Sequence, residues 1–205
     1  MIKVYNFARG ARGVRVFWQC EEMGLPYEVK VLPFPLPDDY QARNPAGGVP
    51  FLEDEGGVAI NESVAIMLYL AQRYGPTPLL PGKDDPAALA RVLQMTVLTE
   101  ATLGGSMNTL MAAHFVAPEA DKRNWSVLGL EDRMAHALGY VSDVLGDQPY
   151  LAGEAFSLAD IAVSTALGIW RGALNGTIPD RLVAYRARLA ERPAYQRAQA
   201  RAAGG

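Results

Sequence analysis

The sequence contains a single cysteine, Cys20, among its 205 residues. One cysteine cannot form an internal disulfide, which fits a reducing compartment. The chain has no run of about 18 apolar residues, the length of a membrane-spanning helix, and its first residues lack the features of a signal peptide. Its formal net charge is −3, whereas nucleic-acid binders are usually basic. We therefore expect a cytoplasmic protein that binds neither membrane nor nucleic acid.

The first part of the chain predicts a small α/β layer. The pattern of apolar residues predicts a strand at 2–6, a helix at 12–23, strands at 27–32, 49–52 and 58–60, and a helix at 63–74. The acidic and glycine residues at 54–57 are typical of a hairpin turn. The order is therefore β-α-β, an irregular link, and β-β-α.

The rest of the chain predicts helices alone. The expected helices cover residues 86–115, with an interruption at Gly104-Gly105, and residues 119–145, 157–170, 180–190 and 194–202. Several prolines precede them and indicate a stiff linker. We divide the chain into a first domain at 1–76, a linker at 77–86 and an all-helical domain at 87–205.

Several residues that could carry chemistry are interpreted as structural. In FSLADIA, Ser157 stands at a helix start with Asp160 three residues later, a capping box that indicates folding rather than catalysis. Cys20 lies on an apolar helix face and is expected to be an inert core thiol. His114 and His136 lack partners at metal-binding spacing, so no metal site is predicted.

The segment at 47–63, GGVPFLEDEGGVAINES, indicates a site for a short peptide. Pro50 cannot donate to a sheet and is expected in cis beside a cleft, which leaves the backbone of Val49 available to an extended ligand. Glu62 and Ser63 begin the next helix, whose N–H groups attract a carboxylate, and Glu62 can pair with an ammonium group. A peptide with a free amino-acid end suits both; an ordinary hairpin and helix cap are the alternative.

Segments along nearly the whole chain resemble the glutathione S-transferase family. NPAGGVPFLEDEGGVAINESVAIMLYLAQRYG resembles its glutathione-binding segment, and QCEEMGLPYE resembles its first helix and second strand. FSLADIA resembles a capping motif of its C-terminal domain, and RPAYQRA resembles its last helix. The resemblance implies an α/β thioredoxin-like N-terminal domain followed by an all-α C-terminal domain. It also implies a homodimer, glutathione as cosubstrate without a tightly bound cofactor, and an electrophile site between the domains.

The family pattern assigns the glutathione contacts to the Gly48 position, the Val49 backbone, the cis proline Pro50, and Glu62 and Ser63. The resemblance implies that Val49 pairs with the cysteinyl part of glutathione. The two residues at the helix start then hold the γ-glutamyl carboxylate and ammonium. Gly48 stands where many members have Lys or Gln, which leaves Gln41 and Arg43 as candidates for that contact.

The residue with which the family activates the glutathione thiol, a Tyr, Ser or Cys, is missing. After the first strand the chain reads YNFARGARGVR, and alignment on EEMG puts Gly10 or Ala11 at the serine-type position. The tyrosine-type position falls on Asn6. Tyr5 is adjacent, but alternation along a strand should turn its side chain away from the face of Asn6. A one-residue insertion would restore Tyr5 and stays a second option.

The arginines of RGARGVR offer another way to activate the thiol, because a cation and a helix N-terminus both lower a thiol pKa. We predict that Arg12, with the N–H groups around Ala11 and Arg12, stabilises the thiolate, with Asn6 as a weaker neutral donor. Arg9 and Ala11 are expected to join the glutathione contacts. Arg15 is expected on a solvated face or against the helical domain. The alternative for these arginines is a solvated positive patch.

Met107, Met111 and Phe115 follow one face of the first long helix. They suit a helical core, but the same face could line the electrophile site, where methionine is adaptable. The predicted function is a glutathione transferase that conjugates glutathione to small apolar electrophiles. The alternatives are a glutathione-dependent peroxidase, reductase, isomerase or lyase, and a non-catalytic glutathione-binding protein.

Overall fold

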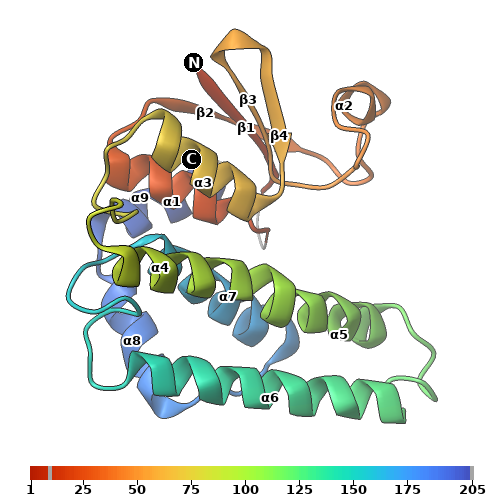
Figure 1. Cartoon of the computed structure of the whole chain (residues 1–205). Helices are drawn as coiled ribbons and strands as arrows, with labels where there is room; N and C mark the ends of the chain where they lie inside the picture. The colour runs from red at the N-terminus through yellow and green to blue at the C-terminus, as the bar shows by residue number, and fades with distance from the viewer. Residues whose placement is uncertain (9–10, 204–205) are drawn as a thin grey trace. The chain divides into compact units, whose positions relative to one another are not determined.

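The computed structural model of the protein describes residues 1–8 and 11–203 (Figure 1). Contacts within the chain define two compact units, one formed by Met1–Thr77 with Leu189–Gly205 and the other by Pro78–Arg188. The first boundary lies at the start of the predicted linker. The last helix groups with the first unit, whereas the sequence pattern placed it with the helices of 87–205.

The first unit is built on a four-stranded sheet. Its elements are β1 (Ile2–Phe7), α1 (Val14–Met23), β2 (Tyr27–Leu32), α2 (Asp38–Arg43), β3 (Phe51–Asp54), the 3₁₀ turn η1 (Glu55–Gly57), β4 (Val58–Asn61), α3 (Ser63–Arg73) and α9 (Pro193–Ala202). The strand order is β2-β1-β3-β4, with β1 parallel to β2 and the other pairs antiparallel. The predicted order of elements is confirmed, and α2 occupies the irregular link, where no helix was predicted.

The two faces of β1 meet different partners. Val4 and Asn6 are 0% and 1% exposed. Helices α1 and α3 cover one side of the sheet (Figure 1), and the Asn6 carboxamide lies against Gly13, directly before α1. Tyr5 points to the other face, where its ring packs 5.7 Å from the rings of both Tyr40, on α2, and Phe51. The predicted orientation of Tyr5, away from the face of Asn6, is confirmed.

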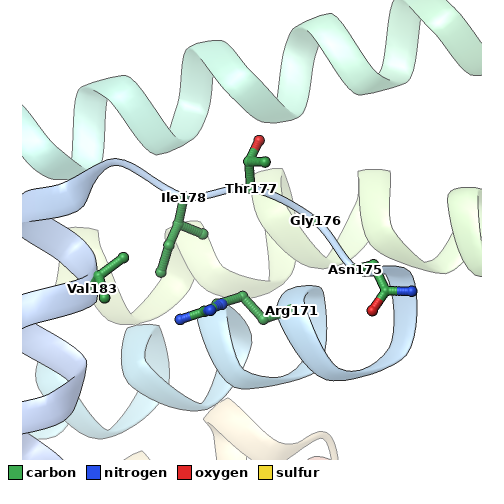
Figure 2. Close-up of a pocket in the computed structure, with 6 residues that line it drawn as sticks. All are labelled: Arg171, Asn175, Gly176, Thr177, Ile178 and Val183. Carbon is green, nitrogen blue, oxygen red and sulfur yellow. The ribbon is translucent and has the colours of Figure 1, made fainter.

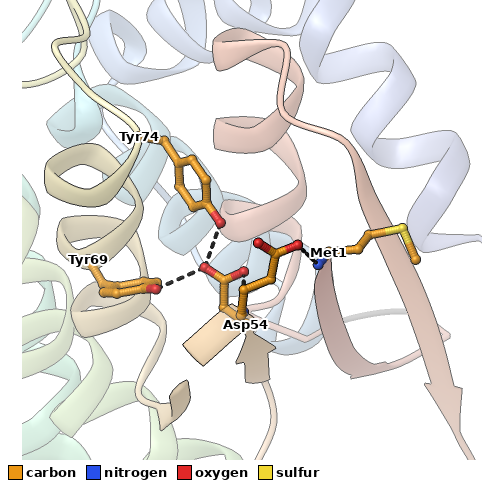
Figure 3. A network of polar contacts seen from close by, with 5 residues as sticks. Met1, Asp54, Tyr69 and Tyr74 are labelled. Carbon is orange, nitrogen blue, oxygen red and sulfur yellow. Dashed lines mark hydrogen bonds and ion pairs between the residues drawn. The ribbon is translucent and has the colours of Figure 1, made fainter. Parts of the chain in front are cut away.

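Asp54, at the end of β3, joins the hairpin to α3 (Figure 3). Its carboxylate accepts hydrogen bonds from the hydroxyls of Tyr69 at 2.8 Å and Tyr74 at 2.6 Å, and from the N–H of Glu55 at 2.8 Å. The N-terminal ammonium of Met1 pairs with Glu55 at 2.7 Å. Burial acts to raise the pKa of Asp54, but the hydrogen bonds from Tyr74, Glu55 and Tyr69 outweigh it, and the pKa is lowered.

Ion pairs hold α9 against α1. Glu22 accepts two hydrogen bonds from the guanidinium of Arg192, at 2.7 and 2.8 Å. Glu21 accepts a hydrogen bond from Arg197 at 2.6 Å. A carboxylate that accepts two parallel guanidinium bonds makes one of the stronger kinds of ion pair. The last helix thus closes the first unit, although it follows the whole helical unit in sequence.

The second unit contains α4 (Pro86–Leu98), the π-helical segment η2 (Thr99–Gly104), α5 (Gly105–Phe115), α6 (Trp125–Leu145), α7 (Leu158–Leu174) and most of α8 (Asp180–Ala190). The α-helix predicted over 86–115 is interrupted by η2, a π-helical segment that ends at Gly104, and α5 begins at Gly105. The backbone stays helical through both glycines, so they do not break the helix. Within the described part of the chain, none of the helices has both the length and the apolar character that a membrane crossing requires.

The predicted capping box at the start of α7 is confirmed. Ser157 and Asp160 are 2% and 0% exposed. One carboxylate oxygen of Asp160 accepts the Ser157 N–H at 2.8 Å and its hydroxyl at 2.9 Å. The other accepts the Leu151 N–H at 2.9 Å and the Tyr185 hydroxyl at 2.6 Å. Burial raises the pKa of Asp160, and these hydrogen bonds oppose the rise.

Candidate functional site

The loop before β3 presents the backbone of Val49. The Val49–Pro50 peptide bond is cis, as expected from the sequence. Pro50 is buried and Val49 is half-buried. Pairing of β3 begins at Phe51, so the N–H and C=O of Val49 lie outside the sheet ladder. Phe51 pairs with Asn61, the last residue of β4, which brings this loop next to the start of α3.

The start of α3 is open. Glu62 is its N-cap with φ 66°, a backbone conformation that L side chains rarely adopt, and no side chain among the described residues caps the helix. The Glu62 side chain is exposed, whereas Ser63 is 2% exposed. An exposed carboxylate beside helical N–H groups suits a ligand that carries both an ammonium and a carboxylate.

Arg15 lies behind Ser63. It is 0% exposed, and its Nη1 donates a hydrogen bond to the Ser63 Oγ at 2.9 Å. Because the oxygen accepts from Arg15, the Ser63 hydroxyl can donate its own hydrogen to a ligand. The expected solvated face for Arg15 is wrong, since α1 is buried without interruption from Val14 to Cys20. The apolar spacing of the helix gave no sign of a buried arginine.

Asn6 supports the start of α1. A Cβ atom on Gly13 would overlap the Asn6 carboxamide, so this approach requires glycine. The Asn6 Nδ2 donates to the Phe7 carbonyl at 3.0 Å. With 1% of its surface exposed, Asn6 lies beneath the helix start. Its catalytic role stays a prediction, and burial restricts that role to an indirect one.

The segment before α1 places Ala11 and Arg12 next to the helix start, and both are half-buried. The Arg12 carbonyl accepts the Arg15 N–H at 3.1 Å, so Arg12 directly precedes the helical ladder. No side chain among the described residues caps α1. Arg9, also predicted to bind glutathione, lies outside the described residues. Arg12 thus lies directly before the N-terminal end of α1, and its role in stabilising a thiolate stays a prediction.

Neither Tyr5 nor Cys20 is placed to act on a thiol, because Tyr5 is hydrogen-bonded elsewhere and Cys20 is buried. The Tyr5 hydroxyl donates to Glu53 at 2.8 Å. Burial and then the Glu53 carboxylate raise the Tyr5 pKa, and the hydroxyl hydrogen is already donated to Glu53 rather than free for a thiolate. Burial, followed by the charge of Glu21, raises the pKa of the Cys20 thiol to about 12. Cys20 is therefore an inert core thiol, as expected.

The Gly48 position is supported from behind by residues that the sequence reasoning missed. The Gly48 carbonyl accepts the Tyr40 hydroxyl at 2.6 Å and the Asn44 Nδ2 at 2.8 Å. Gln41 and Arg43, the two side chains suggested as substitutes at this position, make their hydrogen bonds to other groups. Gln41 donates to a carbonyl of the preceding loop at 3.0 Å, and Arg43 pairs with a β3 carboxylate at 3.3 Å.

The residues predicted for the electrophile site differ in accessibility. Met107 is fully buried and Met111 is half-buried, whereas Phe115 is 63% exposed. They follow one another along α5 at helical spacing, as predicted. Only Met111 and Phe115 expose surface to a ligand, so Met107 supports the helical core.

The helical unit also has a pocket of about 300 Å³ at the C-terminal end of α7 (Figure 2). Its lining consists of Arg171, Asn175, Gly176, Thr177, Ile178 and Val183. A Cβ atom on Gly176 would overlap the indole of Trp170, whose Nε1 donates to the Thr177 carbonyl at 2.9 Å. This turn is therefore built around a tryptophan, and none of the predicted site residues lines the pocket.

Among residues 1–8 and 11–203, no group of three or more His, Cys, Asp or Glu side chains is placed to hold a metal ion.

Comparison with known proteins agrees with this arrangement. The models of the N-terminal and C-terminal domains of glutathione S-transferase match residues 12–73 and 106–193. Glutathione S-transferase 2 of Saccharomyces cerevisiae is 31% identical over 167 residues, which cover 78% of this chain and 70% of that protein.

Two solved structures match almost the whole chain. A glutathione transferase from Methylococcus capsulatus is 28% identical with a TM-score of 0.83, over 98% of both chains. A theta class glutathione S-transferase from Xanthomonas axonopodis pv. citri, with glutathione bound, is 30% identical with a TM-score of 0.79, over 96% of both chains. These relatives match the chain over both units, the thioredoxin-like unit with its cis-proline loop and the helical unit. The chain belongs to the glutathione S-transferase family.

Proposed function

We propose that the protein conjugates the thiolate of glutathione to small apolar electrophiles. The observation that carries this proposal is the pairing of Phe51 with Asn61. It brings the Val49 backbone, which lies outside the sheet ladder, next to Glu62 and Ser63 at the uncapped start of α3. Family membership and the glutathione-bound Xanthomonas relative support the same ligand.

Glutathione is expected to bind as an extended peptide. The Val49 backbone pairs with the cysteinyl part, as an added strand would. The γ-glutamyl ammonium pairs with the exposed Glu62 carboxylate. Its carboxylate accepts hydrogen bonds from the Ser63 hydroxyl and from the N–H groups of the α3 start. Arg15, which donates to the Ser63 oxygen, keeps that hydroxyl directed to the ligand.

The thiol must lose its proton before it can react. An unperturbed thiol has a pKa of about 8.5 and is mostly protonated at neutral pH. Arg12 and the N-terminal end of α1 favour the thiolate electrostatically. The sulfur then attacks the electrophilic carbon, forms a C–S bond and displaces a leaving group such as halide, while the thiol proton passes to solvent. Met111 and Phe115 are proposed to contact the apolar electrophile.

Two measurements separate this function from its alternatives. Turnover of a chromogenic aryl halide with glutathione supports the transferase, and calorimetry shows whether glutathione binds. Glutathione binding without turnover favours a non-catalytic binding protein. Turnover of a peroxide or of an isomerisable substrate, with none of the aryl halide, favours a related glutathione-dependent enzyme that uses the same thiolate.

The ultraviolet absorbance of the bound thiolate tests the role of Arg12. We expect an apparent pKa below that of free glutathione in the wild type. Arg12→Gln should raise this pKa and slow conjugation about 10-fold to 100-fold near neutral pH, since each pKa unit corresponds to about 1.4 kcal/mol. Tyr5→Phe is the control and should change little, because its hydroxyl is bound to Glu53. A shift in Tyr5→Phe alone would instead identify a tyrosine-type transferase.

We also propose a cytoplasmic homodimer that acts in detoxification. The single, buried Cys20 suits a reducing compartment. Light scattering at micromolar concentration should give about twice the chain mass of 22.1 kDa. A species of the chain mass alone would contradict the dimer.

A further inference from the structure

The carbonyl of Gly48 is held by two buried donors. Asn44 and Tyr40 are 1% and 2% exposed. The Asn44 Nδ2 and the Tyr40 hydroxyl approach the same oxygen at 2.8 and 2.6 Å. The Asn44 Nδ2 also donates to the Tyr40 hydroxyl at 3.1 Å, so the two donors are joined. This orientation of the peptide group is therefore fixed from within the first unit.

The Asn44 carboxamide can take only one orientation here. A carbonyl oxygen only accepts hydrogen bonds, so the NH₂ end of Asn44 must face Gly48. The Oδ1 end then accepts the Asn61 Nδ2 at 3.2 Å. Each end of the carboxamide thus has a partner, and no apolar side chain of similar size could replace both contacts.

Because the peptide group is planar, fixing the Gly48 carbonyl also fixes the direction of the Val49 N–H. The Gly48–Val49 peptide bond is trans, so its C=O and N–H point in opposite directions within one plane. Two donors hold the Gly48 carbonyl toward Asn44, and the Val49 N–H therefore points away from Asn44. This N–H belongs to the backbone proposed to pair with the cysteinyl part of glutathione.

The other end of Asn44 reaches the second half of the site. Asn61 is the last residue of β4, and Glu62 and Ser63 follow it directly. The hydrogen bond between Asn61 and Asn44 joins the start of α3 to the loop before β3. A single buried side chain thus contacts both segments that are proposed to hold the ligand.

We propose that Asn44 is a positioning residue that keeps the Val49 backbone and the Glu62–Ser63 helix start at the spacing that glutathione requires. This inference rests on the proposed function. Asn44 does not touch the ligand; it acts through Gly48 and Asn61. Its loss should weaken glutathione binding and leave the chemical step intact.

The test is steady-state kinetics of Asn44→Ala with glutathione and a chromogenic aryl halide. The KM for glutathione should rise about 10-fold to 30-fold, as for the loss of two hydrogen bonds. The kcat at saturating glutathione should stay within about twofold, and the KM for the halide should not change. Calorimetry should show the same loss of glutathione affinity.

Gln19→Ala is the matched control. Gln19 is also a buried amide, 0% exposed, and its Nε2 donates to a main-chain carbonyl, that of Met67, at 2.9 Å. It has no hydrogen bond to the loop of Gly48. Its removal should lower the unfolding midpoint about as much as Asn44→Ala, with the KM for glutathione unchanged. An equal rise of KM in both variants would mean general loosening and would overturn the proposal.

Tyr40→Phe provides a milder variant that keeps the ring and removes one donor. It should raise the KM for glutathione about threefold, and it decides the question if Asn44→Ala does not fold. An unchanged KM for glutathione in Asn44→Ala overturns the positioning role but not the proposed function. If Asn44→Ala does not fold, an unchanged KM in Tyr40→Phe has the same meaning. A wild-type protein that fails to bind glutathione overturns the proposed function, and the role of Asn44 with it.

Discussion

The starts of α7 and α3 differ in how they satisfy the first turn of a helix. At α7 the Asp160 carboxylate accepts the Ser157 N–H within the chain, and both residues are almost completely buried. At α3 the N-cap Glu62 makes no capping bond, its side chain is exposed, and its φ of 66° is unfavourable for a residue with a Cβ.

This difference separates a start that serves folding from one that is available to a ligand. At α7 the capping box and the Leu79 carbonyl already accept N–H groups of the first turn, which leaves fewer donors for a bound carboxylate. An uncapped start with a strained N-cap has donors to offer, at a cost in stability. Both starts carry an acid and a serine, so the residue types alone do not distinguish them.

The largest expected effect is a loss of stability at the start of α7, where the first turn is capped within the chain. Asp160→Ala removes the acceptor of four hydrogen bonds and leaves the buried donors of Leu151, Ser157 and Tyr185 without it. We expect the free energy of unfolding to fall by about 3 kcal/mol or more. Ser157→Ala should cost only about 1 kcal/mol. Urea unfolding measures both, and equal midpoints for wild type and Asp160→Ala would contradict this account of α7.

At the open start, substitution should change binding more than folding. Glu62→Gly relieves the positive φ, so we expect about 1 kcal/mol of added stability. The same change removes the proposed partner of the γ-glutamyl ammonium and should weaken glutathione binding by roughly 1.5–3 kcal/mol.

Glu62→Ala separates the loss of glutathione binding from the gain in stability, because it removes the carboxylate and keeps the Cβ. It should bind glutathione as weakly as Glu62→Gly and show no gain in stability. Calorimetry and urea unfolding on the same samples make the comparison. Unchanged affinity in both variants would remove Glu62 from the site.

The smallest expected effect concerns two acids, one in each unit. The pKa of Asp54 is lowered on folding, so its stabilising contribution is complete above the unfolded pKa and is lost as pH falls through the folded value. The pKa of Asp160 is raised, so its effect has the opposite sign, and protonation relieves the cost of its burial.

Asp54→Asn should therefore reduce the loss of stability in acid. Asp54 is only partly buried, and we expect the change to be under about 1 kcal/mol. Urea midpoints of wild type and variant at neutral and acid pH provide the measurement. Parallel pH profiles for the two proteins would show that Asp54 contributes nothing to acid sensitivity.

Local signals predicted those parts of the fold that depend on neighbouring residues. The capping box of α7 was predicted because its two residues lie three positions apart. The cis bond at Pro50 followed from a proline that enters a strand. The helix α2 was not predicted, since six residues form a marginal helix without tertiary contacts. The continuation of the helix through Gly104-Gly105 also depends on packing rather than on propensity.

The sequence by itself determined the order of elements, the cis-proline loop, the acid and serine at the start of α3, and the family to which the chain belongs. Only the tertiary structure decided what supports that site. Arg15 reaches Ser63 across 48 positions of sequence, and Asn61 reaches Asn44 across 17. Neither contact has a local pattern, because each arises from packing of separate helices and strands around one core. Hydrophobic periodicity shows which face of an element is buried, whereas the partner of a buried polar group depends on the fold.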